Sequence, residues 1–198
     1  MLTKLRNLES DTMTPYVLTT APLLLLLAFF VPPAVIMLGQ DTLFFSYDHW
    51  SFIRPDAAFQ GVGAAMIWLA VVLVSWWATK IAAEKRERPY KLTGLHLTAA
   101  VLTLPAVVLS LSHYAYLDES AAVENKFFAV GETRVAWDDV EHVVREAEAG
   151  SRQVTAYSFE GREDTVTIPY DSSDYQTVQA ISRVQDMYAW DVEEQRDE

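Results

Sequence analysis

Residues 17–38 read VLTTAPLLLLLAFFVPPAVIML and contain no charged side chain. Two further stretches without charge follow, at residues 57–79 and 92–117. Each exceeds the roughly 20 residues that an α-helix needs to cross a hydrocarbon core of about 30 Å. Buried helices of soluble domains are usually shorter and carry a polar stripe, which these stretches lack. The sequence therefore predicts three transmembrane helices, at about residues 17–39, 57–79 and 92–113.

Charge divides the chain into two unlike parts. Residues 1–113 carry seven Asp or Glu and eight Lys or Arg, whereas residues 114–198 carry twenty and seven. The net charge is +1 for the first part and −13 for the second. A surface this acidic repels phosphates, so no nucleic acid is expected as a partner. We expect a transmembrane region at residues 1–113 and an acidic domain at residues 114–198.

The first predicted helix is either a cleaved signal peptide or a retained anchor. Lys4 and Arg6 precede its apolar run, as they do in signal peptides. The run is long, however, and no small-x-small cleavage pattern follows Leu38, so a retained anchor is favoured. Pro32 and Pro33 interrupt the hydrogen-bond ladder of a helix. They predict a kink, which is either a static bend or a moving joint.

Lys and Arg residues in the loops predict the orientation, because these residues resist translocation. The first loop, about residues 41–56, has only Arg54, whereas the second loop has Lys80, Lys85, Arg86, Arg88 and Lys91. We therefore expect the amino terminus and the second loop in the cytoplasm. Three crossings of the cell membrane then place the acidic domain on the extracytoplasmic side. The five basic residues either contact anionic lipid headgroups or only fix the orientation.

The predicted spans offer little for transport chemistry. His96 is the one ionisable side chain at appreciable depth, whereas a proton pathway needs such groups near the bilayer centre. Small residues such as Gly63 and Gly94 allow close helix contact, either within the chain or between copies. A small transporter or channel subunit is the alternative function, and it would require a polar path.

The acidic part changes to a β pattern after Leu117. Residues 113–117 either continue the third helix or begin a strand. Asp138 and Asp139 predict a turn or bulge, and Glu160 with Gly161 predicts a hairpin. A loop is expected at residues 149–151. The expected strands cover residues 121–128, 133–137, 140–144, 154–159 and 165–170.

A helix is predicted to end the domain. Ser172 or Ser173 is the expected N-cap, with Gln176 completing a capping box. Apolar residues at helical spacing predict its buried face: Tyr175, Val178, Ile181, Val184 and Tyr188. The acidic tail beyond Trp190 is expected to fray. The expected fold is an α-helical membrane bundle followed by an α+β domain, with a curved antiparallel sheet and one C-terminal helix.

No pattern in the sequence predicts catalysis. The chain has no cysteine, which excludes disulfides and thiolate chemistry. It has no Gly-rich phosphate loop, nucleophile elbow or His-Glu-x-x-His motif. Asp138, Asp139, Glu141 and His142 resemble metal ligands in composition, but successive strand residues point to opposite faces, so a solvated turn is favoured. We expect no enzyme, no cofactor and no metal site.

Four residues are candidate contacts for a protein partner: Trp137, Asp138, Asp139 and Tyr157. A tryptophan can anchor a partner. For Trp137 a core position that closes the sheet is favoured, because of the apolar area that it would bury.

The acidic part resembles a known family of domains. The run from Tyr116 through Asn125, the pair Phe127-Phe128 and the segment Trp137-Asp138-Asp139-Val140 look like the bacterial pleckstrin-homology-like (PH-like) domains found behind short membrane-helix bundles. The resemblance covers residues 112–190. It implies a curved antiparallel sheet with one C-terminal helix, and a domain that binds protein or lipid without catalysis.

Two features of that family do not match this chain. The family's soluble domain is often thought to be cytoplasmic, whereas the loop charges here predict the opposite side. Eukaryotic relatives bind phosphoinositides through basic strand loops, which a domain of net charge −13 lacks. We therefore expect a non-enzymatic multi-pass membrane protein whose PH-like domain mediates protein–protein interaction or regulation at the membrane surface. Its expected partners are membrane lipid and either a second protein or a second copy of the chain.

Overall fold

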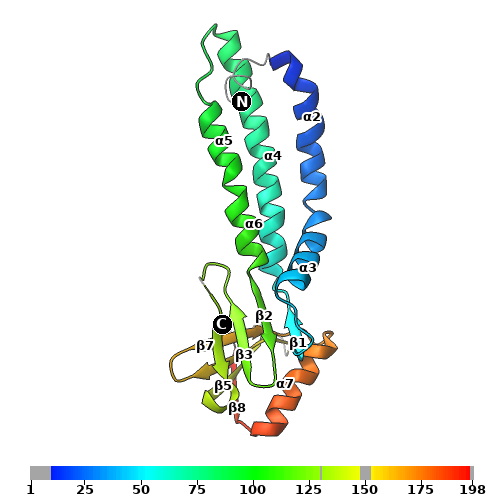
Figure 1. Ribbon diagram of the computed structural model, residues 1–198, viewed down its shortest axis with the longest axis vertical. Coiled ribbons are helices and arrows are strands. Elements are labelled where there is room, and N and C mark those ends of the chain that lie inside the picture. Colours follow the sequence, from blue (N-terminus) through cyan, green and yellow to red (C-terminus); the bar gives the residue numbers. More distant parts are fainter. Residues whose placement is uncertain (1–9, 130, 148–152, 197–198) are drawn as a thin grey trace. The chain divides into compact units, whose positions relative to one another are not determined.

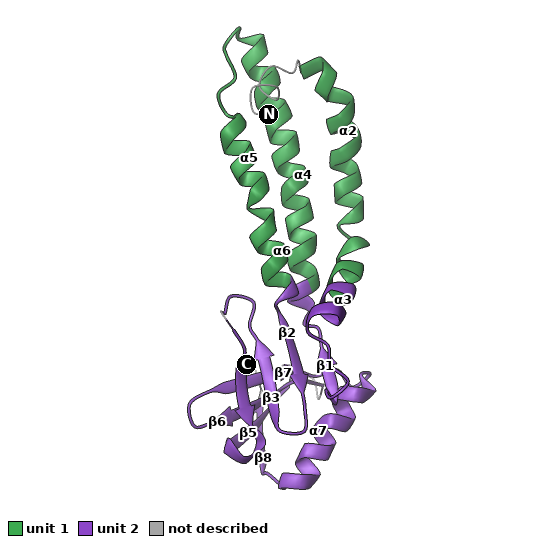
Figure 2. Cartoon of the chain, viewed as in Figure 1, with its two compact units in different colours: residues 1–37, 59–110 green, residues 38–58, 111–198 purple. Residues whose placement is uncertain are grey.

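The computed structural model describes residues 10–129, 131–147 and 153–196 (Figure 1). The chain divides into two compact units (Figure 2). The helical unit consists of Met1–Met37 and Phe59–Ser110, and the sheet unit consists of Leu38–Ala58 and Leu111–Glu198. The loop between the first two predicted spans therefore belongs to the same unit as the acidic domain, which the sequence pattern did not indicate.

The helical unit contains the apolar segments. Its helices are α2 (Ser10–Leu27), α3 (Val31–Leu43), which ends in the sheet unit, α4 (Asp56–Lys85), which begins there, α5 (Thr93–Val101) and α6 (Thr103–Leu111). Two helical stretches, Asp56–Lys85 and Thr93–Leu111, are long and apolar enough to cross a membrane. The bent pair of α2 and α3 makes a third if the two helices form a single span.

The bend between α2 and α3 is 62° and confirms the predicted kink. Pro32 and Pro33 lie in the first turn of α3. Neither proline has an N–H group, so neither can donate to the carbonyl four residues earlier, at Ala28 or Phe29. The backbone ladder therefore stops at this point, and α3 starts in a new direction.

Polar side chains of α4 fasten the neighbouring helices. Trp77 Nε1 donates to Thr14 Oγ1 of α2 at 2.9 Å, and Trp68 Nε1 donates to the carbonyl of Ala99 in α5 at 2.8 Å. Many large apolar side chains of these helices point outward instead, including Leu18, Leu26, Phe29, Leu95, Leu102 and Val108. Such an apolar surface suits a lipid environment.

The sheet unit has two four-stranded sheets. The first has the order β1-β2-β3-β4 and is antiparallel throughout, with strands β1 (Ser51–Ile53), β2 (Tyr114–Leu117), β3 (Ala121–Asn125) and β4 (Thr133–Ala136). The second has the order β7-β6-β5-β8, with strands β5 (Val140–Ala147), β6 (Val154–Gly161), β7 (Thr165–Pro169) and β8 (Val192–Arg196). A 3₁₀ turn, η1 (Trp137–Asp139), joins the two sheets, and helix α7 (Tyr175–Tyr188) follows β7.

Most of the predicted strands are confirmed, and two strands are new. Residues 114–117 form a strand rather than more helix, and the hairpin after Glu160 joins β6 to β7. Strand β1 comes from the loop before α4. Strand β8 lies parallel to β5, so the expectation of a frayed tail beyond Trp190 is wrong. The predicted loop at residues 149–151 lies outside the described residues.

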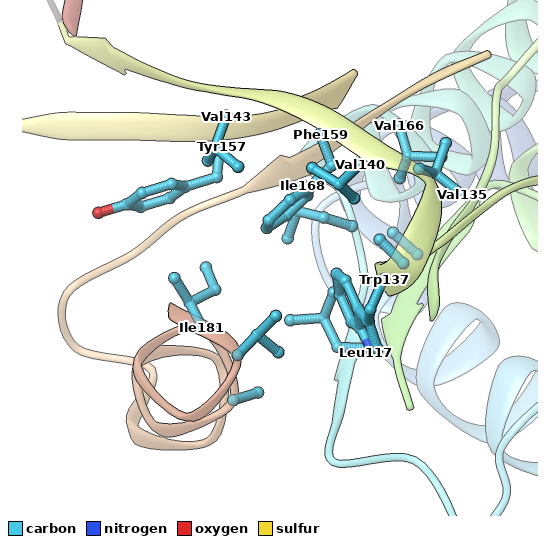
Figure 3. Close-up of a cluster of buried hydrophobic side chains, with 14 residues drawn as sticks. Leu117, Val135, Trp137, Val140, Val143, Tyr157, Phe159, Val166, Ile168 and Ile181 are labelled. Carbon is cyan, nitrogen blue, oxygen red and sulfur yellow. The ribbon is translucent and has the colours of Figure 1, made fainter. Parts of the chain in front are cut away.

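The core of the sheet unit lies where both sheets and α7 meet (Figure 3). Leu117 and Val135 come from the first sheet, Phe159 and Val143 from the second, and Ile181 from α7. All five are almost fully buried. Strand β7 shows the alternation expected of a strand, with Val166 and Ile168 buried and their neighbours less so.

The start and the buried face of α7 differ from the prediction. Asp174, rather than Ser172 or Ser173, caps the helix by accepting hydrogen bonds from the backbone N–H groups of Gln176 and Thr177. Asp174 immediately precedes the first helical residue, which is the N-cap position. The buried residues are Thr177, Ala180, Ile181 and Val184, whereas Tyr175 and Tyr188 are exposed. The buried face of α7 is thus rotated about the helix axis relative to the predicted face. A small residue, Thr177, lies where α7 meets β1.

The end of α7 yields a testable prediction. Ala189 has φ +49° and is the left-handed C-cap of α7. A left-handed conformation costs a residue with a Cβ about 1–2 kcal/mol, and glycine avoids that cost. Ala189→Gly should raise the free energy of unfolding by roughly 1 kcal/mol after the larger entropy of the unfolded glycine chain is subtracted. Thermal unfolding of the full chain in detergent would measure it. Ala180→Gly inside the helix is the control, and it should lower the stability.

Candidate functional site

The loop before β1 folds against the outer side of the first sheet. Phe44 stacks on Tyr114 with ring centroids 4.5 Å apart, and His49 stacks on Tyr116 at 4.0 Å. Phe52 of β1 is stacked between the rings of His49 and Tyr114. Phe44, His49 and Phe52 are therefore committed to packing within the sheet unit, whereas Tyr47 is exposed.

The polar groups around these rings have shifted pKa values. Burial lowers the pKa of His49, although Asp118 and other nearby carboxylates oppose the shift. Burial also raises the pKa of Tyr114, and so does its hydrogen bond to Glu132, in which Tyr114 Oη donates to Oε1 at 2.6 Å. Both shifts favour the uncharged form of the side chain, which suits a closely packed layer of rings.

Strand β1 is also fastened to α7. Ser51 Oγ and Thr177 Oγ1 lie 2.7 Å apart in a buried hydrogen bond. The guanidinium of Arg183 lies over the ring of Trp50, 4.7 Å from its centroid. Strand β1 therefore connects the first sheet to α7. Only two residues, Arg54 and Pro55, separate β1 from α4.

The four candidate partner contacts fall into two groups. Trp137 is 1% exposed, and its Nε1 donates to the carbonyl of Asp118 at 3.1 Å. Tyr157 is 8% exposed and packs edge-on against Tyr170. Both are core residues in the structure, as was favoured for Trp137. Asp138 and Asp139 are exposed on the 3₁₀ turn.

An apolar surface patch lies at the end of α7, beside Asp138. Met187, Tyr188 and Val192 are exposed, and we call these three residues the α7-end patch. Tyr188 stacks on Trp190 at 4.8 Å, which fixes the ring. Burial and the neighbouring carboxylate of Asp138 raise the pKa of Tyr188. The sequence analysis missed this patch because Tyr188 has the spacing of a buried residue, and Val192 lies in the tail that was expected to fray.

The sequence offered Asp138, Asp139, Glu141 and His142 as possible metal ligands, with a solvated turn favoured. Among the described residues, no group of three or more His, Asp or Glu side chains is placed to hold a metal ion. Asp139 instead lines a polar cavity of about 230 Å³ together with Arg134, Arg162, Glu163 and Asp164. The register of β5 against β6 shifts between Val140 and His142, which is a bulge at Glu141. Positively and negatively charged side chains therefore lie together around this open turn.

Of the five basic residues that the sequence assigns to the second loop, Lys80 and Lys85 lie in α4, and the five do not share one environment. Lys80 is 2% exposed, so it is buried rather than available to a headgroup in this structure. Lys85, Arg86, Arg88 and Lys91 are exposed. Three of these, Arg86, Arg88 and Lys91, line a cavity of about 350 Å³, which we call the basic cavity. Tyr90 and Thr79 lie in its wall as well.

Comparison with known proteins found no relative of this chain. No protein-family model, no curated protein and no solved structure matches this chain.

Proposed function

We propose that this protein is a non-enzymatic multi-pass membrane protein whose C-terminal domain binds a protein partner at the membrane surface. The observation that carries the proposal is the α7-end patch. Met187, in the last turn of α7, is 55% exposed, and Val192, the first residue of β8, is 38% exposed. Tyrosine and methionine are enriched in protein interfaces relative to the rest of the surface.

The surroundings of the patch favour one kind of partner. Asp138, Asp186 and Asp191 are exposed near it in sequence or space, and residues 114–198 have a net charge of −13. A basic surface with an apolar centre would complement both features, and charge complementarity of this kind raises the association rate. We therefore propose a partner segment that carries Lys or Arg around an aliphatic or aromatic residue.

The proposal includes three membrane crossings, with α2 and α3 as one bent span. Ile53 pairs with Ala115 in the first sheet, so the residues before α4 and after α6 lie together. If α4 and the α5–α6 stretch both cross, the chain returns to the side that it left, which agrees with this pairing. The basic second loop then lies on the opposite side. Because basic loops stay in the cytoplasm, we propose an extracytoplasmic domain.

We also propose that the C-terminal domain is PH-like. The support is the order of its elements, in which antiparallel strands of two packed sheets precede one helix that caps their common core. Strand β1, contributed by the loop before α4, and strand β8, which follows the helix, are additions to the expected plan. The closed core leaves the domain's surface as the part available for binding.

Affinity purification of the full chain from its native membranes tests the partner-binding proposal. The wild-type chain should retain a defined protein, and the double variant M187D/Y188D should retain at least about tenfold less, since interface aromatics often contribute 2 kcal/mol or more. Tyr175→Asp is the matched control, because Tyr175 is 69% exposed at the other end of α7. It should retain the partner. Equal retention by all three chains, or a solitary monomer in each case, would rule out the patch as the binding surface.

A further inference from the structure

The helical unit contains an apolar cavity of about 330 Å³ formed by α2, α4 and α5. Its wall includes Leu24, Leu73, Trp76, Leu97 and Ala100. Thr20 and Leu97 lie in the wall and are exposed, so the described helices do not seal the cavity. Its volume is at the lower end of the range of about 300–1,000 Å³ that is typical of small-molecule sites. We call it the apolar cavity.

Hydrogen bonds connect the wall of the apolar cavity to the wall of the basic cavity. His96 lies in the first wall, and its Nδ1 is 3.0 Å from Tyr90 Oη in the second wall. Tyr90 Oη is also 2.9 Å from Thr79 Oγ1, and His96 Nε2 is 3.2 Å from Ser75 Oγ. The two cavities are therefore neighbours, and these bonds hold the second loop against α4.

These contacts assign His96 a positioning role. Nδ1 is also 3.0 Å from the carbonyl of Leu92. Because a carbonyl can only accept, Nδ1 carries a hydrogen that is shared between the Leu92 carbonyl and Tyr90 Oη, and Nε2 meets Ser75 Oγ. This hydrogen position is inferred from the hydrogen bonds. With both ring nitrogens engaged, His96 fixes the wall between the cavities.

The boundary between the cavities also offers unused hydrogen-bonding groups. Helix α5 starts at Thr93, and its N-cap residue, Leu92, has no polar side chain that could cap the first turn. Thr93 Oγ1 is buried and has no hydrogen-bond partner among the described residues. The free N–H groups of a helix start attract anions. Arg86, Arg88 and Lys91 form no ion pair with any described carboxylate.

We propose that the helical unit binds one anionic phospholipid, with its phosphate in the basic cavity and part of an acyl chain in the apolar cavity. Arg86 and Arg88 supply charge-assisted hydrogen bonds to the phosphate. Lys91 and the start of α5 add to the positive potential. The lipid crosses from one cavity to the other beside Tyr90. This site is independent of the partner-binding function of the domain, because all of its residues belong to the helical unit.

The combination of the two cavities favours a lipid over other occupants. A soluble phosphate would use the basic cavity and leave the apolar cavity empty. A helix from a second copy of the chain could fill the apolar cavity. It would not explain the three cations of the basic cavity, which have no ion-pair partner among the described carboxylates. A zwitterionic phospholipid also offers a phosphate, but its ammonium group would be repelled by the same three cations. Only an amphipathic anion of lipid size matches both walls at once.

Native mass spectrometry of the purified full chain, titrated with phosphatidylglycerol or phosphatidylcholine in detergent, tests this proposal. One phosphatidylglycerol should bind at least about tenfold more tightly than phosphatidylcholine, since charged hydrogen bonds are individually worth about a factor of ten. The double variant R86Q/R88Q should lose that preference. Lys85→Gln is the matched control, because Lys85 is exposed at the end of α4, next to Arg86, but does not line the basic cavity. It should keep the preference.

A second pair of variants tests the acyl-chain part. Ala100→Phe fills the apolar cavity from α5, and Thr20→Phe fills it from α2. Each should weaken phosphatidylglycerol binding by a similar factor while leaving the melting temperature of the chain near that of the wild type. Two filled variants from different helices guard against one that fails to fold. Unchanged binding in a folded filled variant, equal loss in Lys85→Gln, or equal affinity for phosphatidylcholine would each overturn the proposal.

Discussion

Replacing Trp137 by alanine should lower the free energy of unfolding of the sheet unit by about 3–5 kcal/mol, the usual cost of removing a buried tryptophan. The ring is 1% exposed and packs against Phe159 at 5.4 Å and Trp190 at 6.2 Å between centroids. Its loss would leave a cavity where the two sheets meet. It would also leave the carbonyl of Asp118 without the hydrogen bond that the indole donates.

Pulse proteolysis of the full chain in detergent, across a urea gradient, would measure this loss without relying on tryptophan fluorescence. Trp137→Phe keeps a ring but not the indole N–H group, so its cost should be intermediate. The exposed Tyr175→Ala should change the stability by less than about 0.5 kcal/mol. A cost below 1 kcal/mol for Trp137→Ala would contradict the core position of this residue.

The sequence predicted those elements that depend on local pattern. Apolar length alone identified α4 and the α5–α6 stretch, and the Pro32-Pro33 pair identified the bend before α3. Alternation and turn residues identified β6 and β7. In each case the cause lies within about 20 residues of chain, so a window along the sequence contains it.

The elements that sequence analysis missed depend on distant partners. Ser51 of β1 pairs with Leu117, and Val192 of β8 pairs with Val143. Nothing in the charged segment around Glu193 and Glu194 indicates a strand, because its stability comes from the parallel neighbour. The N-cap of α7 was misplaced by one or two residues for a different reason. Three capping residues lie in a row at 172–174, and the fold decides which one precedes the first turn.

The candidate sites were predictable only in part. Composition marked the basic second loop, and the structure divides it into a buried Lys80, an outlying Lys85 and three cavity-lining cations. The apolar cavity is built from three helices far apart in sequence, so no local signal exists for it. The exposed Tyr188 was assigned to the buried face because spacing alone does not fix the rotation of a helix about its axis.

Strand β1 also links the fold to the membrane topology. It is separated from α4 by Arg54 and Pro55, while β2 is separated from α6 by Ser112 and His113. Since β1 and β2 pair, the first loop and the acidic domain must share one side of any membrane that α4 and α5–α6 cross. The loop charges then decide only on which side of the membrane the first loop and the acidic domain lie. The pairing therefore reduces the topology to two alternatives that a single labelling experiment can distinguish.

Single-cysteine variants labelled with a membrane-impermeant maleimide should react in an all-or-none pattern on intact cells. The chain has no cysteine, so each variant carries one reactive site. Tyr47→Cys in the first loop, where Tyr47 is 97% exposed, and Ser172→Cys in the domain should both react from outside. Pro89→Cys in the basic loop should react only after permeabilisation, because basic loops stay in the cytoplasm. Permeabilised cells control for expression and accessibility of all three variants.

The possible outcomes separate the parts of this prediction. The reverse pattern, with only Pro89→Cys labelled from outside, would overturn the orientation and leave the fold intact. Reaction of Tyr47→Cys and Ser172→Cys on different sides would contradict the pairing of β1 with β2, since the strands could not then meet. Reaction of all three on one side would contradict the crossing of the α4 and α5–α6 hairpin. The basic cavity would then lie on the same side of the membrane as the acidic domain.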